Sequence, residues 1–153
     1  MSIEFEVERD VRVPKERLYN ALLDLEAAEH WMQGLVGIEQ QVAGPMREGS
    51  TWIETRKMYG SKASEHFEVV ELVPNGKIVI RVDGTKGTTG KGEYHFTYRI
   101  AGTGDKSNVH LHGKIGGLTG VTKLFGKMMA GPFKKATAKD LDALKDYLES
   151  NKG

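Results

Sequence analysis

The sequence predicts an α+β fold, in which a curved seven-stranded antiparallel sheet wraps around a long C-terminal helix. Three observations favour it. The opening residues alternate apolar and charged side chains, short apolar runs separated by turn residues fill the middle of the chain, and the last ~30 residues have helical apolar spacing. With a rise of ~1.5 Å per residue, a helix of that length can cross a whole sheet. The predicted order is one strand, two helices, six strands and the long helix.

The first strand and the helices after it are marked by a change of period. Apolar residues occupy one side of residues 3–13 and charged residues the other, which is typical of a half-buried strand. Pro14 ends this strand and presets a helical φ angle. Helical apolar spacing then predicts a short helix to about Asp24 and a second helix that carries Ala28 and Trp31.

Six further strands are predicted from short apolar runs bounded by turn residues. The tripeptide from Pro74 to Gly76 is a strong hairpin signal between two of them. The predicted strands are residues 35–42, 51–59, 63–73, 78–82, 93–100 and 108–115.

The last helix carries an apolar stripe that suits the concave face of a curved sheet. Pro132 cannot donate a hydrogen bond to the carbonyl of Met128, so the helix is expected to bend or to start anew there. Met128 and Met129 are flexible side chains that adapt to irregular apolar surfaces. The first half is therefore predicted to line a cavity and the second half to close the core. The alternative is that the methionines only fill gaps in the core.

Composition excludes several classes of function. A chain of 153 residues has the length of a single domain, residues 1–153. Its 22 basic and 21 acidic side chains give a formal charge of +1, which argues against nucleic acid as a partner. The absence of cysteine excludes disulfides, thiol nucleophiles and thiolate metal sites. No apolar run is long enough for stable membrane insertion and no signal peptide pattern is present, which predicts a cytoplasmic protein.

Four stretches of the sequence carry a family resemblance. They are VPKERLYNALLDLEAAEHW, REGSTW, FEVVELVPNGKIVI and KDLDALKDYLE. In this order and spacing, the chain resembles the START-like or SRPBCC superfamily, and within it the polyketide cyclase/dehydrase and lipid-transport group. The resemblance covers nearly the whole chain and implies the helix-grip fold, with a deep apolar cavity between sheet and C-terminal helix. It implies no particular reaction, because the superfamily includes lipid carriers, receptors, cyclases and chaperone co-activators.

A charged pair is expected inside this cavity. If Gly49 begins its strand as in the family, then Trp52, Glu54, Arg56 and Met58 face inward. Glu54 and Arg56 would lie roughly 7 Å apart along the strand, in an apolar chamber where a lone charge is costly. The pair could orient a ligand carbonyl or hydroxyl, and Glu54 could act as a general acid or base. Two alternatives stay open: the two side chains satisfy each other, or the parity is reversed and both lie on the surface.

The wall of the implied cavity consists mostly of aromatic and methionine side chains, with Glu54 and Arg56 providing polar orientation. The predicted ligand-binding residues are Trp31, Trp52, Glu54, Arg56, Met58, Phe67, Tyr94, Phe96, Tyr98, Phe125, Met128, Met129 and Phe133.

Histidines and a glycine-rich segment are candidates for a metal site and a phosphate site. His110 and His112 share a strand face, and His95 is expected nearly opposite His110, a set that zinc or copper could use. The other strand face holds better cavity residues, so an exposed histidine cluster without metal is preferred, and no cofactor is predicted. Residues 84–92 lack the ending of a phosphate-binding loop. They are interpreted either as a mobile gate of the cavity or as a plain flexible hairpin.

Binding of a small hydrophobic or amphipathic ligand, such as a lipid, a polyketide or an aromatic compound, is the predicted function. One alternative is an enzyme resembling the aromatase/cyclases, in which Glu54, Arg56 or a tyrosine transfers protons. Another is a protein-interaction module like the chaperone co-activators of this fold, which would use the basic surface around Lys134 and Lys135. Formation of a homodimer is left open.

Overall fold

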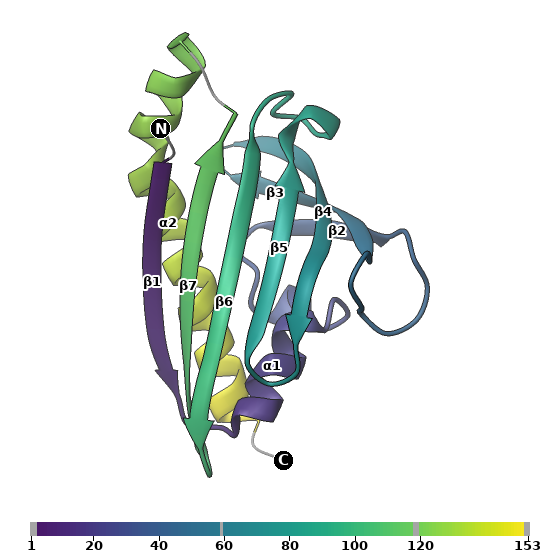
Figure 1. Cartoon of the computed structure of the whole chain (residues 1–153), viewed down its shortest axis with the longest axis vertical. Helices are drawn as coiled ribbons and strands as arrows, with labels where there is room; N and C mark the ends of the chain where they lie inside the picture. Colours follow the sequence, from purple (N-terminus) through teal and green to yellow (C-terminus); the bar gives the residue numbers. More distant parts are fainter. Residues whose placement is uncertain (1–2, 59, 118–119, 152–153) are drawn as a thin grey trace.

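A seven-stranded antiparallel sheet curves around one face of a long C-terminal helix (Figure 1). The computed structural model describes residues 3–58, 60–117 and 120–151, without the side chains of Met58, residues 120–127 and Met129. In chain order the elements are β1 (Ile3–Val11), α1 (Lys15–Leu23), the 3-10 turn η1 (Ala28–His30), β2 (Leu35–Gln40), β3 (Thr51–Met58), β4 (Ser61–Val73), β5 (Lys77–Asp83), the 3-10 turn η2 (Gly84–Lys86), β6 (Glu93–Thr103), β7 (Lys106–Gly116) and α2 (Gly120–Ser150).

The strands lie in the order β1-β7-β6-β5-β4-β3-β2. Strands β2 to β7 are therefore a meander of hairpins, and β1 joins beside β7, the last strand of that meander. All six neighbouring pairs are antiparallel. This confirms the α+β class, the seven strands and the terminal helix expected from the sequence.

Strand β1 shows how alternation fixes the inner face. Ile3, Phe5 and Val7 are buried, whereas the acidic residues between them are exposed. Phe5 pairs with Gly113 of β7, where an added Cβ would lie 2.4 Å from the Phe5 ring. The missing side chain at Gly113 therefore makes room for the ring, which reaches Phe96 on β6 with 6.3 Å between ring centroids.

The helical region after β1 is shorter than predicted. Helix α1 follows Pro14 as expected, but the second helix is a single 3-10 turn with Trp31 directly after it. The reason lies at Asp24, whose carboxylate accepts hydrogen bonds from the backbone N–H groups of Glu26 and Ala27. These bonds offer the backbone a turn instead of a continued helix.

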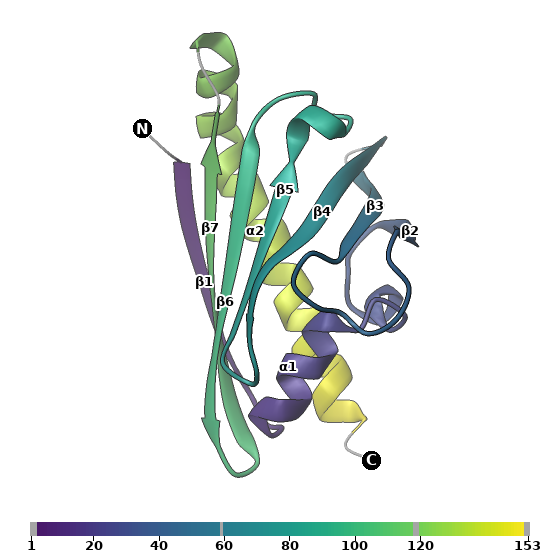
Figure 2. The same cartoon turned by 45° about the vertical axis from the view of Figure 1, so that its right-hand side comes forward.

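Helix α2 is continuous from Gly120 to Ser150, so of the two outcomes expected at Pro132, a bend or a new helix, the new helix is wrong. The turn before the proline faces solvent, since Met128 is 70% exposed and an added Cβ at Gly131 would meet nothing within 4 Å. The ring thus disturbs a helical turn that packs against little else. Figure 2 shows the N-terminal part of α2 projecting past the end of β7, while the remainder runs behind the sheet toward α1.

The C-terminal half of α2 closes the core, as predicted. Leu141, Leu144 and Leu148 are at most 2% exposed and pack with Leu18 of α1 in one cluster. At about 25 cal/mol per Å² of apolar surface removed from water, such burial stabilises the folded state by roughly 2 kcal/mol per leucine. Among the described residues, no helix combines the length and apolarity needed to cross a membrane.

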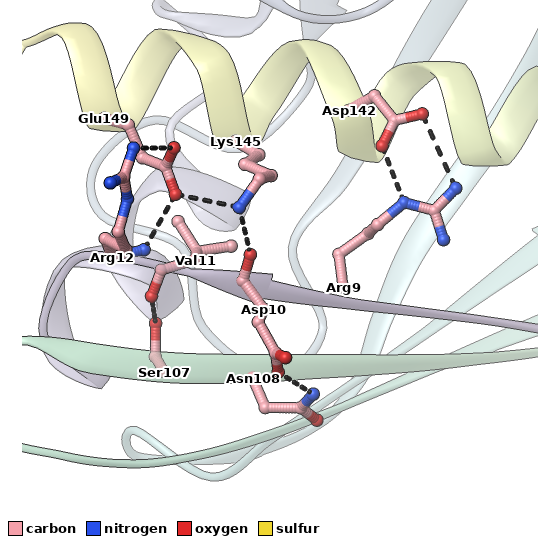
Figure 3. Close-up of polar contacts among 9 residues, drawn as sticks. All are labelled: Arg9, Asp10, Val11, Arg12, Ser107, Asn108, Asp142, Lys145 and Glu149. Atoms are coloured by element: carbon pink, nitrogen blue, oxygen red, sulfur yellow. Dashed lines mark hydrogen bonds and ion pairs between the residues drawn. The ribbon is translucent and has the colours of Figure 1, made fainter.

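Polar contacts fasten this half of α2 to β1 (Figure 3). The Arg9 guanidinium donates to Asp142 at 2.6 Å, and Lys145 donates to the Asp10 carbonyl at 2.6 Å. Glu149 accepts from the Arg12 backbone N–H at 2.9 Å and from Lys145 at 2.9 Å. The backbone hydrogen bond from Arg12, followed by that from Lys145, lowers the pKa of Glu149 to about 2.

Candidate functional site: a cavity between the sheet and α2

A cavity of about 380 Å³ lies between the concave face of the sheet and the middle of α2. Apolar and aromatic side chains make up most of its wall, together with a few charged and hydroxyl groups. Nine of the predicted residues line it: Trp31, Trp52, Glu54, Arg56, Phe67, Tyr94, Phe96, Tyr98 and Phe133.

Strand register builds one wall from a single row of inward side chains. Trp52, Phe67, Val82, Tyr94 and Ile115 are successive partners across β3, β4, β5, β6 and β7, and all five line the cavity. The rings of Trp52 and Phe67 stack at 5.3 Å with an interplanar angle of 15°. Period-two alternation on five adjacent strands therefore turns scattered aromatic residues into one continuous surface.

The parity of β3 is the inward one. Trp52 and Glu54 are 3% and 4% exposed, Arg56 is half-buried, and all three line the cavity, while Lys57 is exposed. The alternative of a reversed parity is thereby ruled out for these residues. The other alternative holds, because the Arg56 Nε donates to Glu54 Oε2 at 2.6 Å. The predicted contribution of Met58 concerns a side chain outside the described part of the structure.

Arg56 also binds a third charged residue, Asp140 of α2. Its Nη1 donates to Asp140 Oδ2 at 2.7 Å, and the backbone N–H of Gln33 donates to the other carboxylate oxygen at 2.9 Å. Burial alone would lower the pKa of Arg56, but the charges of Glu54 and Asp140 outweigh it and raise that pKa. Burial raises the pKa of Asp140, against the opposing effect of Arg56. This trio joins the sheet to the helix inside the cavity.

Sequence reasoning missed Asp140, although a signal was present. Counting back along α2, Thr137, Ala136 and Phe133 lie three, four and seven residues earlier, and all line the cavity. A charged residue on the apolar stripe of a helix needs a partner, and Arg56 was already expected inside. Tyr98 lies close to this trio, since its pKa is raised chiefly by burial and further by the charge of Asp140.

A second polar group lies beside the first and was also missed. Glu65 of β4 is the direct cross-strand partner of Glu54, and both line the cavity. Glu65 Oε1 accepts hydrogen bonds from the backbone N–H of Thr89, at 3.1 Å, and from its hydroxyl. Burial raises the pKa of nearby Tyr94; Thr89 opposes this effect and Glu65 adds to it. The pairing of the two glutamates follows from the register of β3 and β4, which the sequence alone does not give.

The glycine-rich segment 84–92 is tied to β4 and Thr89 lines the cavity. The backbone N–H of Thr88 donates to the Ser64 carbonyl at 2.8 Å, and the Ser64 N–H donates to the Thr88 hydroxyl at 2.9 Å. An added Cβ at Gly87 would lie 2.0 Å from Glu65 Oε2, so the loop approaches the strand as closely as a glycine allows. These contacts describe a fastened loop at the cavity wall.

The part of α2 that lines the cavity differs from the prediction. Its described lining residues run from Phe133 to Leu141, in the middle of the helix. Met128 is 70% exposed and does not line the cavity. The prediction for Met128 is therefore wrong. The side chains of Phe125 and Met129 lie outside the described residues.

The histidines do not converge as their spacing suggested. His95 pairs with Lys114, because the turn between β6 and β7 is centred after Gly104, later than expected. His112 contacts Glu4 at 2.9 Å and His110 lies 3.7 Å from Glu6, on the side of β1 that carries its exposed acids. Within the described part of the chain, no group of three potential metal ligands is found.

Comparison with family models decides the assignment of the chain. The model of the family described as polyketide cyclase / dehydrase and lipid transport matches residues 2–149. The chain belongs to this family. Membership confirms the START-like resemblance of the sequence, and the cavity lies in the chain segment that this polyketide cyclase/dehydrase and lipid transport model covers. No curated protein matches the sequence.

Solved structures share the fold of this family member. The Zhui aromatase/cyclase from a Streptomyces species has a TM-score of 0.80 and 14% identity, covering 97% of this chain and 94% of its own. A Thermus thermophilus protein has a TM-score of 0.78 and 16% identity, covering 99% of this chain and 100% of its own. A START superfamily protein from Mycobacterium smegmatis has a TM-score of 0.74 and 16% identity, covering 95% of this chain and 98% of its own. At such low identity, the likeness establishes the fold and leaves the ligand to be argued from the site.

Proposed function

We propose that this family member binds a small apolar or amphipathic ligand in the cavity between the sheet and α2. The observation that carries the proposal is the cavity itself, whose volume of about 380 Å³ falls within the ~300–1,000 Å³ of typical small-molecule sites. Its wall is largely aromatic, and its polar groups are few and clustered, as in sites that bury a ligand body and orient one end.

The contrast with the adjoining core supports this proposal. Leu18, Leu111 and Leu144 are fully buried in the adjoining core, so side chains fill the space beneath that part of the sheet. Phe67, Phe96 and Tyr98 stay half-buried on the same inner face. Large aromatic side chains left partly uncovered inside a fold are available to a ligand.

Native mass spectrometry of the protein purified from cells tests this function, followed by extraction of anything bound. We expect a stoichiometric small-molecule passenger, or else saturable binding of an environment-sensitive fluorophore. The variant Ala136→Phe places a ring into the cavity from α2 and should abolish both signals. Lys135→Phe, at an exposed neighbouring position, is the matched control and should keep them. Unchanged binding in Ala136→Phe would contradict the proposal.

A second candidate function, proton transfer on a bound carbonyl compound, is favoured by the trio of Arg56, Glu54 and Asp140. Burial raises the pKa of Asp140 against the opposing effect of Arg56, which is the direction expected of a carboxyl group that exchanges protons with a ligand. If the protein is an enzyme of this kind, incubation with a poly-carbonyl compound should yield a cyclised product, and Asp140→Asn should slow the reaction without weakening binding. Recovery of the compound unchanged would leave binding alone.

A further inference from the structure

Acidic side chains outnumber basic ones in the described part of the cavity wall. Among the described lining residues, three are acidic (Glu54, Glu65 and Asp140) and one is basic (Arg56). The protein as a whole carries a formal charge of +1, so the excess of acidic groups belongs to the cavity and not to the average surface. A charge in an apolar enclosure is screened far less than one in water, so this local excess acts on whatever enters.

The charge of Arg56 is already compensated by two carboxylates of the protein. Its Nε is engaged by Glu54 at 2.6 Å and its Nη1 by Asp140 at 2.7 Å. A ligand carboxylate at Arg56 would meet the negative charges of both partners, or would have to displace one and leave it buried without its cation. Such uncompensated buried charges are strongly unfavourable. The single guanidinium in the described wall therefore serves the protein's own carboxylates.

Glu65 supplies a negative charge for which the described residues provide no counter-ion. It lies directly opposite Glu54, where like charges on facing strands destabilise a sheet. Its Oε1 is bound by the backbone and hydroxyl of Thr89, which are neutral donors, and its buried Oε2 has no hydrogen-bond partner among the described residues. A cation placed in the cavity would relieve this repulsion, whereas an anion would increase it.

Aromatic faces beside these carboxylates suit the same ligand. The stacked rings of Trp52 and Phe67 occupy the row next to Glu54 and Glu65, and Tyr94 lies in that row on β6. Ring faces attract cations by their quadrupole, and the attraction grows when water is excluded. The aromatic rings and the excess of carboxylates thus both favour a ligand whose polar end is positively charged.

We propose that the cavity selects amphipathic ligands whose polar end is a protonated amine, and that it discriminates against carboxylates such as fatty acids. The apolar body would lie against the aromatic row, and the ammonium group would sit near Glu65 and the carboxylates of the trio. This inference rests on the proposed function, because it specifies the chemical class of the ligand for the same cavity.

Three probes that share an alkyl tail and differ in the charge of the head group test this selectivity. They are decylamine, decanol and decanoic acid, titrated below their micelle-forming concentrations at neutral pH. Displacement of an environment-sensitive fluorophore reports binding of each. We expect the amine to bind about tenfold or more tightly than the alcohol, and the alcohol more tightly than the acid. Equal affinities for all three, or a preference for the acid, would overturn the proposal while leaving ligand binding intact. Failure of the fluorophore and of all three probes would instead count against the proposed function.

Neutral isosteres test which charges are responsible. Glu65→Gln should reduce the preference for the amine over the alcohol by several-fold, because it removes the carboxylate that has no counter-ion among the described residues. Asp140→Asn is a second variant, expected to raise the affinity for decanoic acid because Arg56 loses one partner. The matched control is Glu39→Gln, an equal change of charge at an exposed position of β2 outside the cavity. If Glu65→Gln and Asp140→Asn both keep the selectivity of the unmodified protein, as the control should, the carboxylates do not determine it and the proposal fails.

Discussion

At the scale of single residues, the cavity depends on groups that would be costly alone. Arg56 compensates Glu54 and Asp140, and all three side chains are largely withdrawn from water. The benefit of such a trio is modest compared with a well-packed apolar alternative, but removal of one member leaves the others unpaired. The trio therefore fixes the geometry of the cavity more than it raises the stability of the fold.

Replacement of Arg56 by leucine should expose this dependence. Arg56→Leu leaves Glu54 and Asp140 buried without a cation, and we expect it to lower the free energy of unfolding by about 3 kcal/mol at neutral pH. The loss should shrink at pH 4 to 5, because burial raises the pKa of Asp140 and its carboxyl group can then take up a proton. Denaturant titration at the two pH values measures the difference. An equal loss at both would show that lost packing, not charge, is responsible.

The close contact between Gly113 and the Phe5 ring leads to a second prediction for a single residue. Gly113→Ala introduces a methyl group 2.4 Å from the Phe5 ring, which must move, so the free energy of unfolding should fall by about 1–3 kcal/mol. Phe5 also lines the cavity, so fluorophore affinity should change. Gly116→Ala, on the same strand with nothing within 4 Å of the new Cβ, is the control in the same denaturant titration. A similar loss in both variants would point to a general effect on the strand.

At the scale of elements, α2 is held most firmly along its C-terminal half. That half is buried against the core and joined to β1 by Asp142 and Lys145, and to the following Arg12 by Glu149 (Figure 3). The N-terminal part of α2 projects past the sheet (Figure 2). The cavity lies against the segment between these two parts, where the helix meets the sheet through Arg56 and Asp140.

The contact of Glu149 with Arg12, which directly follows β1, predicts a dependence on pH. The pKa of Glu149 is lowered to about 2 in the folded state, so its contribution is fully present above its ordinary pKa near 4.5 and is lost as pH falls toward 2. Glu149→Gln should therefore reduce the free energy of unfolding by about 1 kcal/mol at neutral pH. The difference from the unmodified protein should vanish near pH 2, measured by denaturant titration across that range. A constant difference would mean that the charge of Glu149 is not what matters.

At the scale of the whole molecule, one curved sheet serves two purposes along its length. Where α1 and the end of α2 pack on it, leucines fill the interior. Further along, aromatic side chains and the charged trio line open volume. Filled core supplies the stability that allows the adjoining region to stay open, because a cavity forfeits dispersion contacts and hydrophobic burial.

Paired substitutions on one helix should separate these two regions. Leu144→Ala opens a void in packed core and should lower the free energy of unfolding by about 2–5 kcal/mol, with little effect on ligand affinity. Phe133→Ala, one part of the cavity wall, should cost less stability and should change affinity clearly, since its ring is already partly uncovered. Thermal or denaturant unfolding with parallel fluorophore titration measures both. The reverse pattern would mean that the open volume is not the binding site.

Much of the fold could be predicted because its signals are local. Alternation in β1, the proline before α1, the hairpin turn at Asn75 and the stripe of α2 each act within a few residues of chain. The errors concern positions where local signals compete with others. Asp24 replaced a helix by a turn, and the exposed turn at Met128 tolerated the Pro132 ring within one helix.

The sequence by itself determined the order of elements and named most of the aromatic residues of the cavity wall, because these follow from the period of side chains along single segments. It left the parity of β3 open, because alternation along one strand does not say which of its two faces lies inward. Tertiary structure decided what those segments bring together. Asp140 meets Arg56 across 84 residues of chain, and Glu65 meets Glu54 through a strand register that composition cannot reveal. The charge balance inside a cavity depends on such long-range contacts. A carboxylate loses its hydration, and comes within reach of its cationic partner, only when the sheet has curved around the helix.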